Sequence, residues 1–278
     1  MRAIPQDQII SLDLPQLAQP LQLHYHEAGS GEPVLFIHGS GPGASGYSNF
    51  KGNFRVFGEA GYRAIVPDLP GYGLSDKPDT QYHLDLFVDA MTGLLDRLDI
   101  GQVTLVGNSL GGAIALKMAL DNPARVKKLL LMAPGGLMDK AEYYQRMEGI
   151  QTMAAAFAAG ELRDAVGMKR LLCLQLFDAS QVTDETVAER VNVVLEQPAC
   201  VLSTMDVPNM AQRLGELSCP IFVMWGMNDK FCPVDGVETL MNHCRNIRVQ
   251  LLSECGHWVM VEYQDLFNRQ CLDFIAHD

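Results

Sequence analysis

Residues 103–112 read Val-Thr-Leu-Val-Gly-Asn-Ser-Leu-Gly-Gly, an apolar run that leads directly into the pattern Gly-x-Ser-x-Gly. The run predicts a buried strand, and the small and apolar residues at 113–120 predict a helix after it. Gly107 and Gly111 permit a tight turn between the two elements, because larger side chains there would clash. Such a turn presents the hydroxyl of Ser109 at the positive end of the helix, which makes Ser109 a candidate nucleophile.

Similar short apolar runs recur along the chain, separated by glycine-containing turns and helix-like segments. They lie at Val34–Ile37, Ala64–Val66, Val103–Val106, Leu129–Met132, Ile221–Trp225 and Val249–Leu252. Unbroken Val/Ile/Leu runs are typical of strands that are buried on both faces. The pattern therefore predicts an α/β fold in which helices flank a mostly parallel sheet.

The segment between Met132 and Ile221 has no convincing strand. Apolar residues instead recur with helical spacing over Ala141–Phe157, Glu161–Leu176 and Thr183–Leu195. Helical insertions of this kind tend to cover ligand sites at the carboxyl ends of strands. We expect a core domain of residues 1–137 and 207–278, and a helical cap of residues 138–206.

The composition is that of a globular protein with an acidic surface. The chain has 278 residues, 48% of them hydrophobic, and a formal net charge of −12. Disordered chains have fewer apolar residues, and proteins that bind nucleic acids or anionic membranes need basic surfaces, so we expect neither disorder nor such partners. No membrane-spanning run or secretory signal is expected. Seven cysteines without a Cys-x-x-Cys pair favour free thiols in the cytoplasm.

A carboxylate and a histidine follow the last two expected strands. Asp229 comes after Ile221–Trp225, and His257 comes after Val249–Leu252. The chain order Ser109, Asp229, His257 is that of a catalytic triad, in which His257 takes the hydroxyl proton and Asp229 orients the imidazole.

Other carboxylates are weaker candidates for the acid of the triad. Asp139 falls near the start of the expected cap, and Glu254 is only three residues before His257. Asp68 lies in a loop rich in glycine and proline, and we interpret it as a residue that shapes this loop.

A second glycine-rich loop, residues 38–43 (His-Gly-Ser-Gly-Pro-Gly), follows the strand Val34–Ile37. Glycines let backbone amides approach a ligand closely, so Gly39 and Gly41 are candidate substrate-binding positions. We expect the amides of Ser40 and Leu110 to form an oxyanion hole. His38 is interpreted as an orienting or packed histidine, because His257 is the better candidate base.

His24 and His26 alternate on an expected early strand and could suggest a metal site. Two histidines without a third ligand are more typical of surface side chains. We therefore expect neither a metal nor an organic cofactor.

Together these motifs resemble the α/β-hydrolase fold, and within it the meta-cleavage product hydrolases. The resemblance extends from Leu21 to the C-terminus. The segments that carry it are His38–Ala44 with Tyr47–Phe50, Gly107–Ser109, Pro134–Leu137, and Cys255–Trp258 with the residues after it. Enzymes of that family hydrolyse a carbon–carbon bond in 2-hydroxy-6-oxohexa-2,4-dienoates, which arise in the catabolism of aromatic compounds. The resemblance implies this reaction, with 2-hydroxypenta-2,4-dienoate and a carboxylic acid as products.

The resemblance also implies a role for Arg190. Taken alone, Arg190 is interpreted as a solvated helix arginine near Glu189 and Glu196. By resemblance it binds the carboxylate of the anionic dienoate, a role that suits a planar guanidinium better than a lysine.

Three further residues are assigned by resemblance. Asn49 and Asn108 would hydrogen-bond the dienol end of the substrate and position Ser109. Trp258 would form a wall of the pocket, although plain core packing is the alternative. The family association also suggests a homodimer or a larger homo-oligomer.

Two other functions use the same motifs. A general carboxylesterase would use the same triad on small esters, but an ester needs no carboxylate clamp. A non-catalytic small-molecule receptor of the same fold would retain the triad without turnover. The preferred substituent on carbon 6 stays open, with Met138, Met147, Met153, Leu172 and Phe177 as candidate cap residues.

Overall fold

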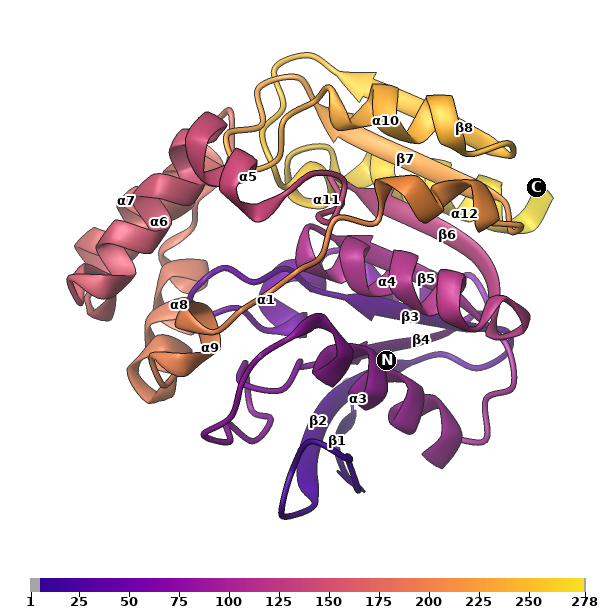
Figure 1. The fold of residues 1–278 in the computed structure, drawn as a ribbon, viewed down its shortest axis with the longest axis horizontal. Coiled ribbons are helices and arrows are strands. Elements are labelled where there is room, and N and C mark those ends of the chain that lie inside the picture. Colours follow the sequence, from indigo (N-terminus) through magenta and orange to yellow (C-terminus); the bar gives the residue numbers. More distant parts are fainter. Residues whose placement is uncertain (1–5, 278) are drawn as a thin grey trace.

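The computed structural model describes residues 6–277, which contain an eight-stranded sheet (Figure 1). The strands are β1 (Gln6–Leu12), β2 (Leu21–Ala28), β3 (Pro33–Ile37), β4 (Arg63–Pro67), β5 (Val103–Asn108), β6 (Val126–Met132), β7 (Ile221–Gly226) and β8 (Ile247–Leu252). Their spatial order is β1-β2-β4-β3-β5-β6-β7-β8. β2 pairs antiparallel with β1 and β4, and all other pairs are parallel. The predicted mostly parallel sheet is confirmed.

Helices cover both faces of this sheet. One face carries α3 (Leu84–Arg97), α4 (Leu110–Asp121) and α10 (Gly236–His243). The other face carries α1 (Gly46–Phe50), α2 (Phe54–Glu59), α11 (Val259–Glu262) and α12 (Gln264–His277).

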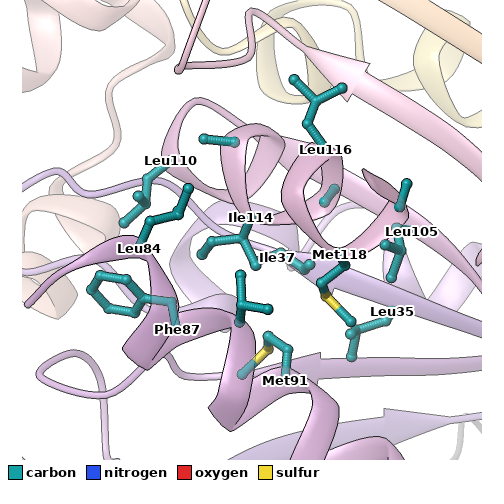
Figure 2. Packing of buried hydrophobic residues seen from close by; sticks show 14 of the residues in the cluster. Leu35, Ile37, Leu84, Phe87, Met91, Leu105, Leu110, Ile114, Leu116 and Met118 are labelled. Carbon is teal, nitrogen blue, oxygen red and sulfur yellow. The ribbon is translucent and has the colours of Figure 1, made fainter. Parts of the chain in front are cut away.

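Alternate residues of β3 belong to the two cores on opposite sides of the sheet. Val34 and Phe36 pack on the side of α2 and α12, whereas Leu35 and Ile37 pack on the side of α3 and α4. Figure 2 shows the second of these cores, in which side chains of α3 and α4 meet the sheet. All four β3 residues are fully buried, which is why the strand reads as an unbroken apolar run.

The segment between β6 and β7 contains no strand. It holds α5 (Lys140–Arg146), α6 (Glu148–Ala158), α7 (Ala165–Gln175), α8 (Asp184–Glu196) and α9 (Cys200–Ser203), with short 3-10 turns at Glu161–Arg163 and Ala179–Gln181. These helices lie together beyond one end of the sheet (Figure 1). The expected helix over Ala141–Phe157 is divided at Met147, where the backbone is extended. A further 3-10 turn, Ala211–Glu216, leads back to β7.

None of the helices within residues 6–277 is long and apolar enough to cross a lipid bilayer. All seven cysteines are free thiols, and Cys232, Cys244, Cys255 and Cys271 are buried.

Candidate active site

Ser109 stands on a strained turn between β5 and α4. Its backbone has φ +57° and ψ −115°, which is an unfavourable region for a residue with a side chain. A Cβ atom on Gly107 would lie 2.4 Å from the carbonyl oxygen of Gly111, and one on Gly111 would lie 1.9 Å from that of Ile37. The two glycines of Gly-x-Ser-x-Gly are therefore required by close backbone contacts, and the turn leaves Ser109 partly exposed.

The loops after β7 and β8 bring Asp229 and His257 together. Nδ1 of His257 lies 2.7 Å from Oδ2 of Asp229, and both side chains are buried. The other oxygen of Asp229 accepts hydrogen bonds from the backbone N–H groups of Phe231 (2.7 Å) and Cys232 (2.9 Å). The carboxylate is thus fixed on one side by the loop and directed at the imidazole on the other. With Nδ1 bound to Asp229, Nε2 is the ring nitrogen left for proton transfer.

The two rival acids lie elsewhere. Asp139 is exposed and accepts a hydrogen bond from Asn209 at 3.1 Å, and Glu254 is an exposed residue with φ +53°. The geometry therefore favours Asp229 as the acid that partners His257.

The glycine-rich loop after β3 rests on a neutral histidine. Nδ1 of His38 donates to the carbonyl of Gly39 at 2.8 Å, while Nε2 accepts from the N–H of Leu69 at 2.9 Å. Burial lowers the pKa of His38 to about 4, which keeps the ring in this neutral form at neutral pH. His38 is thus a buried support for the loop, and it makes no contact that would suit a general base.

The two candidate oxyanion-hole residues flank the nucleophile. Leu110 is the first residue of α4, so its N–H has no acceptor within the helix. The carbonyl of Ser40 accepts a hydrogen bond from the hydroxyl of Tyr72 at 3.2 Å, which fixes the loop at this position. Ser40 and Ser109 line the same cavity, so a ligand at Ser109 also meets the Ser40 loop.

A small cavity of about 20 Å³ lies beside Ser109, and we call it the polar compartment. Most of the predicted site residues line it: Gly39, Ser40, Gly41, Asn49, Asn108, Ser109, Arg190, His257 and Trp258. Asp229 lies behind His257, and Leu110 lines the neighbouring cavity described below. The predicted residues come from the sheet loops, from α1 and from α8, which shows that the cap completes the site.

Arg190 is buried at the centre of this arrangement, with 1% of its surface exposed. Its Nη2 donates to Oδ1 of Asn49 at 2.7 Å, and its guanidinium lies 4.7 Å above the ring of Trp258. The carboxylate of Glu189 pairs with Lys51 at 3.0 Å, and its charge acts on Arg190 only from a greater distance. Burial lowers the pKa of Arg190 to about 9, so the side chain still carries its charge at neutral pH. The interpretation of Arg190 as a solvated arginine is therefore wrong.

Asn108 is buried beneath the nucleophile. Its Nδ2 donates to the carbonyls of Met132 and His257, each at 3.3 Å, which ties the Ser109 turn to the His257 loop. Its Oδ1 has no hydrogen-bond partner among the described residues. Asn108 thus retains an acceptor for a donor group in the cavity.

A larger cavity of about 380 Å³ also borders Ser109, and we call it the apolar compartment. Ser40, Ser109, Ile150 and Met153 line both compartments, so the two meet at the nucleophile. The remaining walls are mainly apolar side chains of the cap and its flanks, such as Phe157, Leu202, Met205 and Val207. Of the five candidate cap residues, Met153 lines this cavity, whereas Phe177 is 49% exposed.

Sequence reasoning missed three residues that line the polar compartment: Ile150, Gln175 and Phe231. The carbonyl of Gln175 accepts a hydrogen bond from the N–H of His257 at 2.7 Å, so the end of α7 also anchors the loop that carries His257. Helical spacing could identify Gln175 only as a polar residue near the end of a cap helix, since burial of its side chain depends on how the cap docks.

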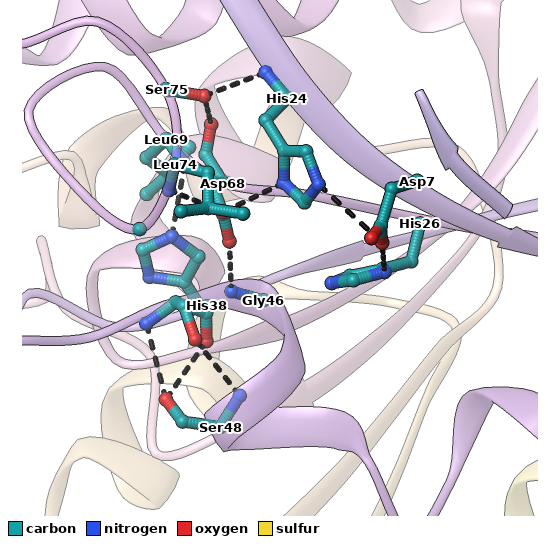
Figure 3. Close-up of polar contacts among 12 residues, drawn as sticks. Asp7, His24, His26, His38, Gly46, Ser48, Asp68, Leu69, Leu74 and Ser75 are labelled. Atoms are coloured by element: carbon teal, nitrogen blue, oxygen red, sulfur yellow. Dashed lines mark hydrogen bonds and ion pairs between the residues drawn. The ribbon is translucent and has the colours of Figure 1, made fainter. Parts of the chain in front are cut away.

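Asp68 and His24 form a second, separate buried pair (Figure 3). Asp68 accepts hydrogen bonds from the N–H groups of Gly46 (2.7 Å) and Leu74 (2.8 Å), and from Nδ1 of His24 (2.8 Å). These contacts agree with a loop-shaping role for Asp68. The expectation that His24 and His26 are surface side chains is wrong for His24, which is 2% exposed. Its position on the inner side of β2, against the Asp68 loop, buries it.

Comparisons with known proteins agree with this geometry. Residues 32–263 match the family model described as the alpha/beta hydrolase fold. The chain is 38% identical to a 2-hydroxy-6-oxo-6-phenylhexa-2,4-dienoate hydrolase of Burkholderia cepacia, and 38% identical to a 2-hydroxy-6-oxononadienedioate/2-hydroxy-6-oxononatrienedioate hydrolase of Comamonas testosteroni. Each alignment covers 92% of both proteins. The chain belongs to the meta-cleavage product hydrolases.

A solved structure leads to the same family. The meta-cleavage product hydrolase of Pseudomonas fluorescens superimposes with a TM-score of 0.81 at 28% identity, over 92% of this chain and 94% of that one. Family membership makes carbon–carbon bond hydrolysis in ketonic compounds the reaction class of this hydrolase. The names of the two curated relatives differ beyond carbon 6, with a phenyl group in one and a second carboxylate in the other.

Proposed function

We propose that this hydrolase cleaves the bond between carbons 5 and 6 of 2-hydroxy-6-oxohexa-2,4-dienoates, with Ser109 as nucleophile, His257 as base and Asp229 as the acid that orients it. The products are 2-hydroxypenta-2,4-dienoate and a carboxylic acid. The observation that carries this proposal is Arg190, a buried cation that lines the same cavity as Ser109 and has no carboxylate ion-pair partner among the described residues. A buried charge is costly without a counter-ion, so a substrate carboxylate suits this position.

The first stage converts the dienol into its keto form. The hydroxyl on carbon 2 loses its proton, and carbon 5 gains one. Arg190 holds the carboxylate on carbon 1, and the free Oδ1 of Asn108 is available to a donor at the dienol end. This change makes carbon 5 a leaving group, because the ketone on carbon 2 can accept its electron pair.

The second stage is nucleophilic attack. The oxygen of Ser109 bonds to carbon 6 while His257 takes the hydroxyl proton, and the amides of Ser40 and Leu110 stabilise the resulting oxyanion. When the tetrahedral intermediate collapses, the bond between carbons 5 and 6 breaks. Its electron pair passes along the conjugated chain to the oxygen on carbon 2, which takes up a proton. The acyl group stays on Ser109 until water, activated by His257, releases it as a carboxylic acid.

We further propose that the group on carbon 6 enters the apolar compartment, and that this hydrolase prefers an uncharged aryl or bulky alkyl group there. The support is the apolar lining of Phe157, Leu202 and Val207 and the volume of about 380 Å³. Lys140 also lines the compartment, but its Nζ donates to the carbonyl of Met205 at 2.6 Å. A second substrate carboxylate would have to displace this contact.

A parallel assay of wild-type protein tests the reaction. Loss of the visible absorbance of a 6-phenyl dienoate is compared with release of p-nitrophenol from a small ester. We expect kcat/KM for the dienoate to exceed that for the ester, and Ser109→Ala to abolish both. Efficient ester turnover without dienoate turnover would favour the carboxylesterase, and tight dienoate binding without turnover would favour the receptor.

A substrate series tests the preference on carbon 6. Dienoates with phenyl, methyl and carboxyethyl groups share the same carboxylate end, so differences in kcat/KM report on the apolar compartment. We expect the order phenyl, methyl, carboxyethyl. A preference for the carboxyethyl compound would refute the proposed role of the compartment.

We also propose a cytoplasmic homodimer or larger homo-oligomer. Seven free thiols support a reducing compartment, and the oligomer is an inference from the family. Light scattering coupled to size-exclusion chromatography measures the assembly, and a monomeric mass at micromolar concentration would exclude it.

A further inference from the structure

A cluster of two histidines and one aspartate lies at the β1 edge of the sheet, away from both compartments of the active site. β1 and β2 pair antiparallel, and their register places Asp7 directly opposite His26 and brings His24 to the same face two residues earlier. Figure 3 shows the three side chains converging, and we call them the Asp7 cluster. Sequence reasoning found the two histidines but not the third residue, because the pairing of β1 with β2 was not predicted.

The donor atoms of the Asp7 cluster face one another at short range. Nδ1 of His26 lies 2.8 Å, and Nε2 of His24 lies 3.6 Å, from Oδ1 of Asp7. One donor atom from each residue fits within 4.8 Å of the others, and among the described residues this is the one group of three or more His, Cys, Asp or Glu side chains that does so. Zinc bonds of about 2.0–2.1 Å in a tetrahedral site put ligand atoms roughly 3.3 Å apart. The two distances to Oδ1 of Asp7, 2.8 Å from His26 and 3.6 Å from His24, lie on either side of this ligand-to-ligand separation.

Both histidine nitrogens that face the cluster are buried and make no hydrogen bond among the described residues. Each nitrogen has the same ion-pair partner, Oδ1 of Asp7, at 3.6 Å for His24 and 2.8 Å for His26. His24 is 98% buried, since its exposed fraction is 2%. Buried polar atoms normally make well-formed hydrogen bonds, so two buried nitrogens that share one oxygen of an exposed carboxylate are suited to a ligand between them.

Asp68 prepares His24 to act as a ligand. Its Oδ2 accepts from Nδ1 of His24 at 2.8 Å, which leaves the lone pair of Nε2 directed at Asp7 and His26. Histidines that bind metals commonly donate their other N–H to a carboxylate in this way.

The surroundings of the cluster favour a cation. A cavity of about 380 Å³ reaches it, with Asp7, His26, Asp68, Glu189 and Arg55 among its lining residues. Asp68 is paired with His24 and Glu189 with Lys51, so Asp7 is the carboxylate of this cavity that can join the two imidazoles at an ion. The side chain of Asp7 is 68% exposed, which gives an ion a route from solvent.

We propose that Asp7, His24 and His26 bind one divalent transition metal ion of the Zn²⁺ type, with water as the remaining ligand. Two imidazoles and one carboxylate suit Zn²⁺, Co²⁺, Ni²⁺ or Cu²⁺ better than Mg²⁺ or Ca²⁺, which prefer oxygen ligands. The cavity at the cluster shares no lining residue with the two compartments at Ser109. The ion therefore acts as a clip that holds β1 onto β2, and the hydrolytic reaction does not use it.

Binding of Co²⁺ to the full chain tests the proposal. Protein freed of metal by a chelator is titrated with Co²⁺ near pH 8, where protons compete less for the two imidazoles. We expect one Co²⁺ per chain by elemental analysis, with the visible absorbance of a tetrahedral ion. Saturating Zn²⁺ should raise Tm by about 5 °C, because it binds only the folded chain.

Two variants assign the ion to the cluster. His26→Asn and Asp7→Asn each remove one ligand atom, and we expect each to weaken Co²⁺ binding at least tenfold and to remove the rise in Tm. His83→Asn is the matched control, because His83 is an exposed histidine whose ring bonds to Gln81. All three variants should turn over the dienoate as wild type does.

Two results would overturn the proposal. One is metal-free protein that binds no Co²⁺ at saturating excess. The other is a His26→Asn protein that binds Co²⁺ as tightly as wild type, which would locate the ion at other side chains. Asp7 is exposed, so its variant should fold, and its circular dichroism spectrum checks this directly.

Discussion

The two compartments that meet at Ser109 are built on opposite principles. The polar compartment is small, about 20 Å³, and is held by directed contacts such as the 2.7 Å hydrogen bond from Arg190 to Asn49. The apolar compartment is about 380 Å³ and is lined mainly by apolar side chains, whose van der Waals contacts do not depend on precise orientation. Under the proposed function, this difference means that one end of the substrate is selected by charge and geometry, whereas the other is selected by size and hydrophobicity.

This contrast predicts unequal sensitivity to mutation. A directed contact is lost when one atom is removed, and its buried partner is left unpaired. An apolar wall loses only the contact area of the side chain that is shortened. We expect the largest effects at the junction, smaller ones in the polar compartment and the smallest in the apolar one.

The largest effect is expected at the junction, where Asp229→Asn should lower kcat about 10⁴-fold. The amide still accepts from Phe231 and Cys232, but it favours the wrong tautomer of His257. Asp235→Asn is the control, because Asp235 is a half-exposed carboxylate that pairs with Arg146. Steady-state kinetics on the dienoate measure both. Loss of less than tenfold for Asp229→Asn would remove it from the triad.

The free energy of unfolding should depend on pH through His38, which supports the glycine-rich loop of the polar compartment. The pKa of His38 is lowered from 6.5 to about 4 in the folded chain, so the unfolded chain takes up the proton first as pH falls. The stability from neutral His38 is therefore present above pH 6.5 and is lost as pH falls towards 4, by about 3 kcal/mol at most. Urea unfolding at several pH values measures this loss, and His38→Asn should reduce it. An identical pH dependence in wild type and variant would contradict the neutral, buried state of His38.

Within the polar compartment, Asn49→Ala should raise KM for the dienoate about tenfold. Asn49 fixes the guanidinium of Arg190, and a hydrogen bond to a charged group contributes about 1.5–3 kcal/mol. The effect on kcat should be smaller, since Asn49 acts through Arg190. Asn209→Ala, an exposed asparagine bonded to Asp139, is the control. A fall in kcat with unchanged KM would show that Asn49 acts on the reacting atoms instead.

The smallest effect is expected in the apolar compartment. Phe157→Ala should lower kcat/KM for a 6-phenyl dienoate about three- to tenfold, because it removes apolar contact, and should leave a 6-methyl dienoate almost unchanged. Phe177→Ala is the matched control, as Phe177 is half-exposed and lines neither compartment. Equal losses on both substrates would indicate that Phe157 supports the cap rather than the substituent.

The sequence predicted those strands and turns that a short run of neighbouring residues is enough to specify. Five of the six apolar runs marked strands that are mostly buried on both faces, and Gly107 and Gly111 marked a turn that tolerates no side chain. The expectation is wrong for the sixth run, Val249–Leu252, because β8 is an edge strand in which only Leu252 is buried. β1 was not predicted, because its residues QDQIISL are largely polar and it lies at the edge of the sheet. The division of the first cap helix at Met147 also had no clear signal.

Residues whose role depends on docking between distant segments were harder to predict. Gln175 and Phe231 reach the polar compartment only because the cap and the Asp229 loop fold over it. Arg190 looked like a solvated helix residue, and only the family resemblance indicated an inward orientation. Spacing within one helix shows which residues share a face, but it does not show what that face meets.

The proposed role of Arg190 is tested most directly by comparing how much Arg190→Gln lowers kcat/KM for an anionic dienoate and for an uncharged ester. In wild type and Arg190→Gln, kcat/KM is measured for the 6-phenyl dienoate and for an uncharged p-nitrophenyl ester. The variant removes a buried cation that has no carboxylate partner in the described chain, so we expect it to fold. We predict that the dienoate value falls about 100-fold, as expected for a lost buried charge pair, and that the ester value changes less than about threefold. Equal changes for the two substrates would contradict the claim that Arg190 binds the substrate carboxylate.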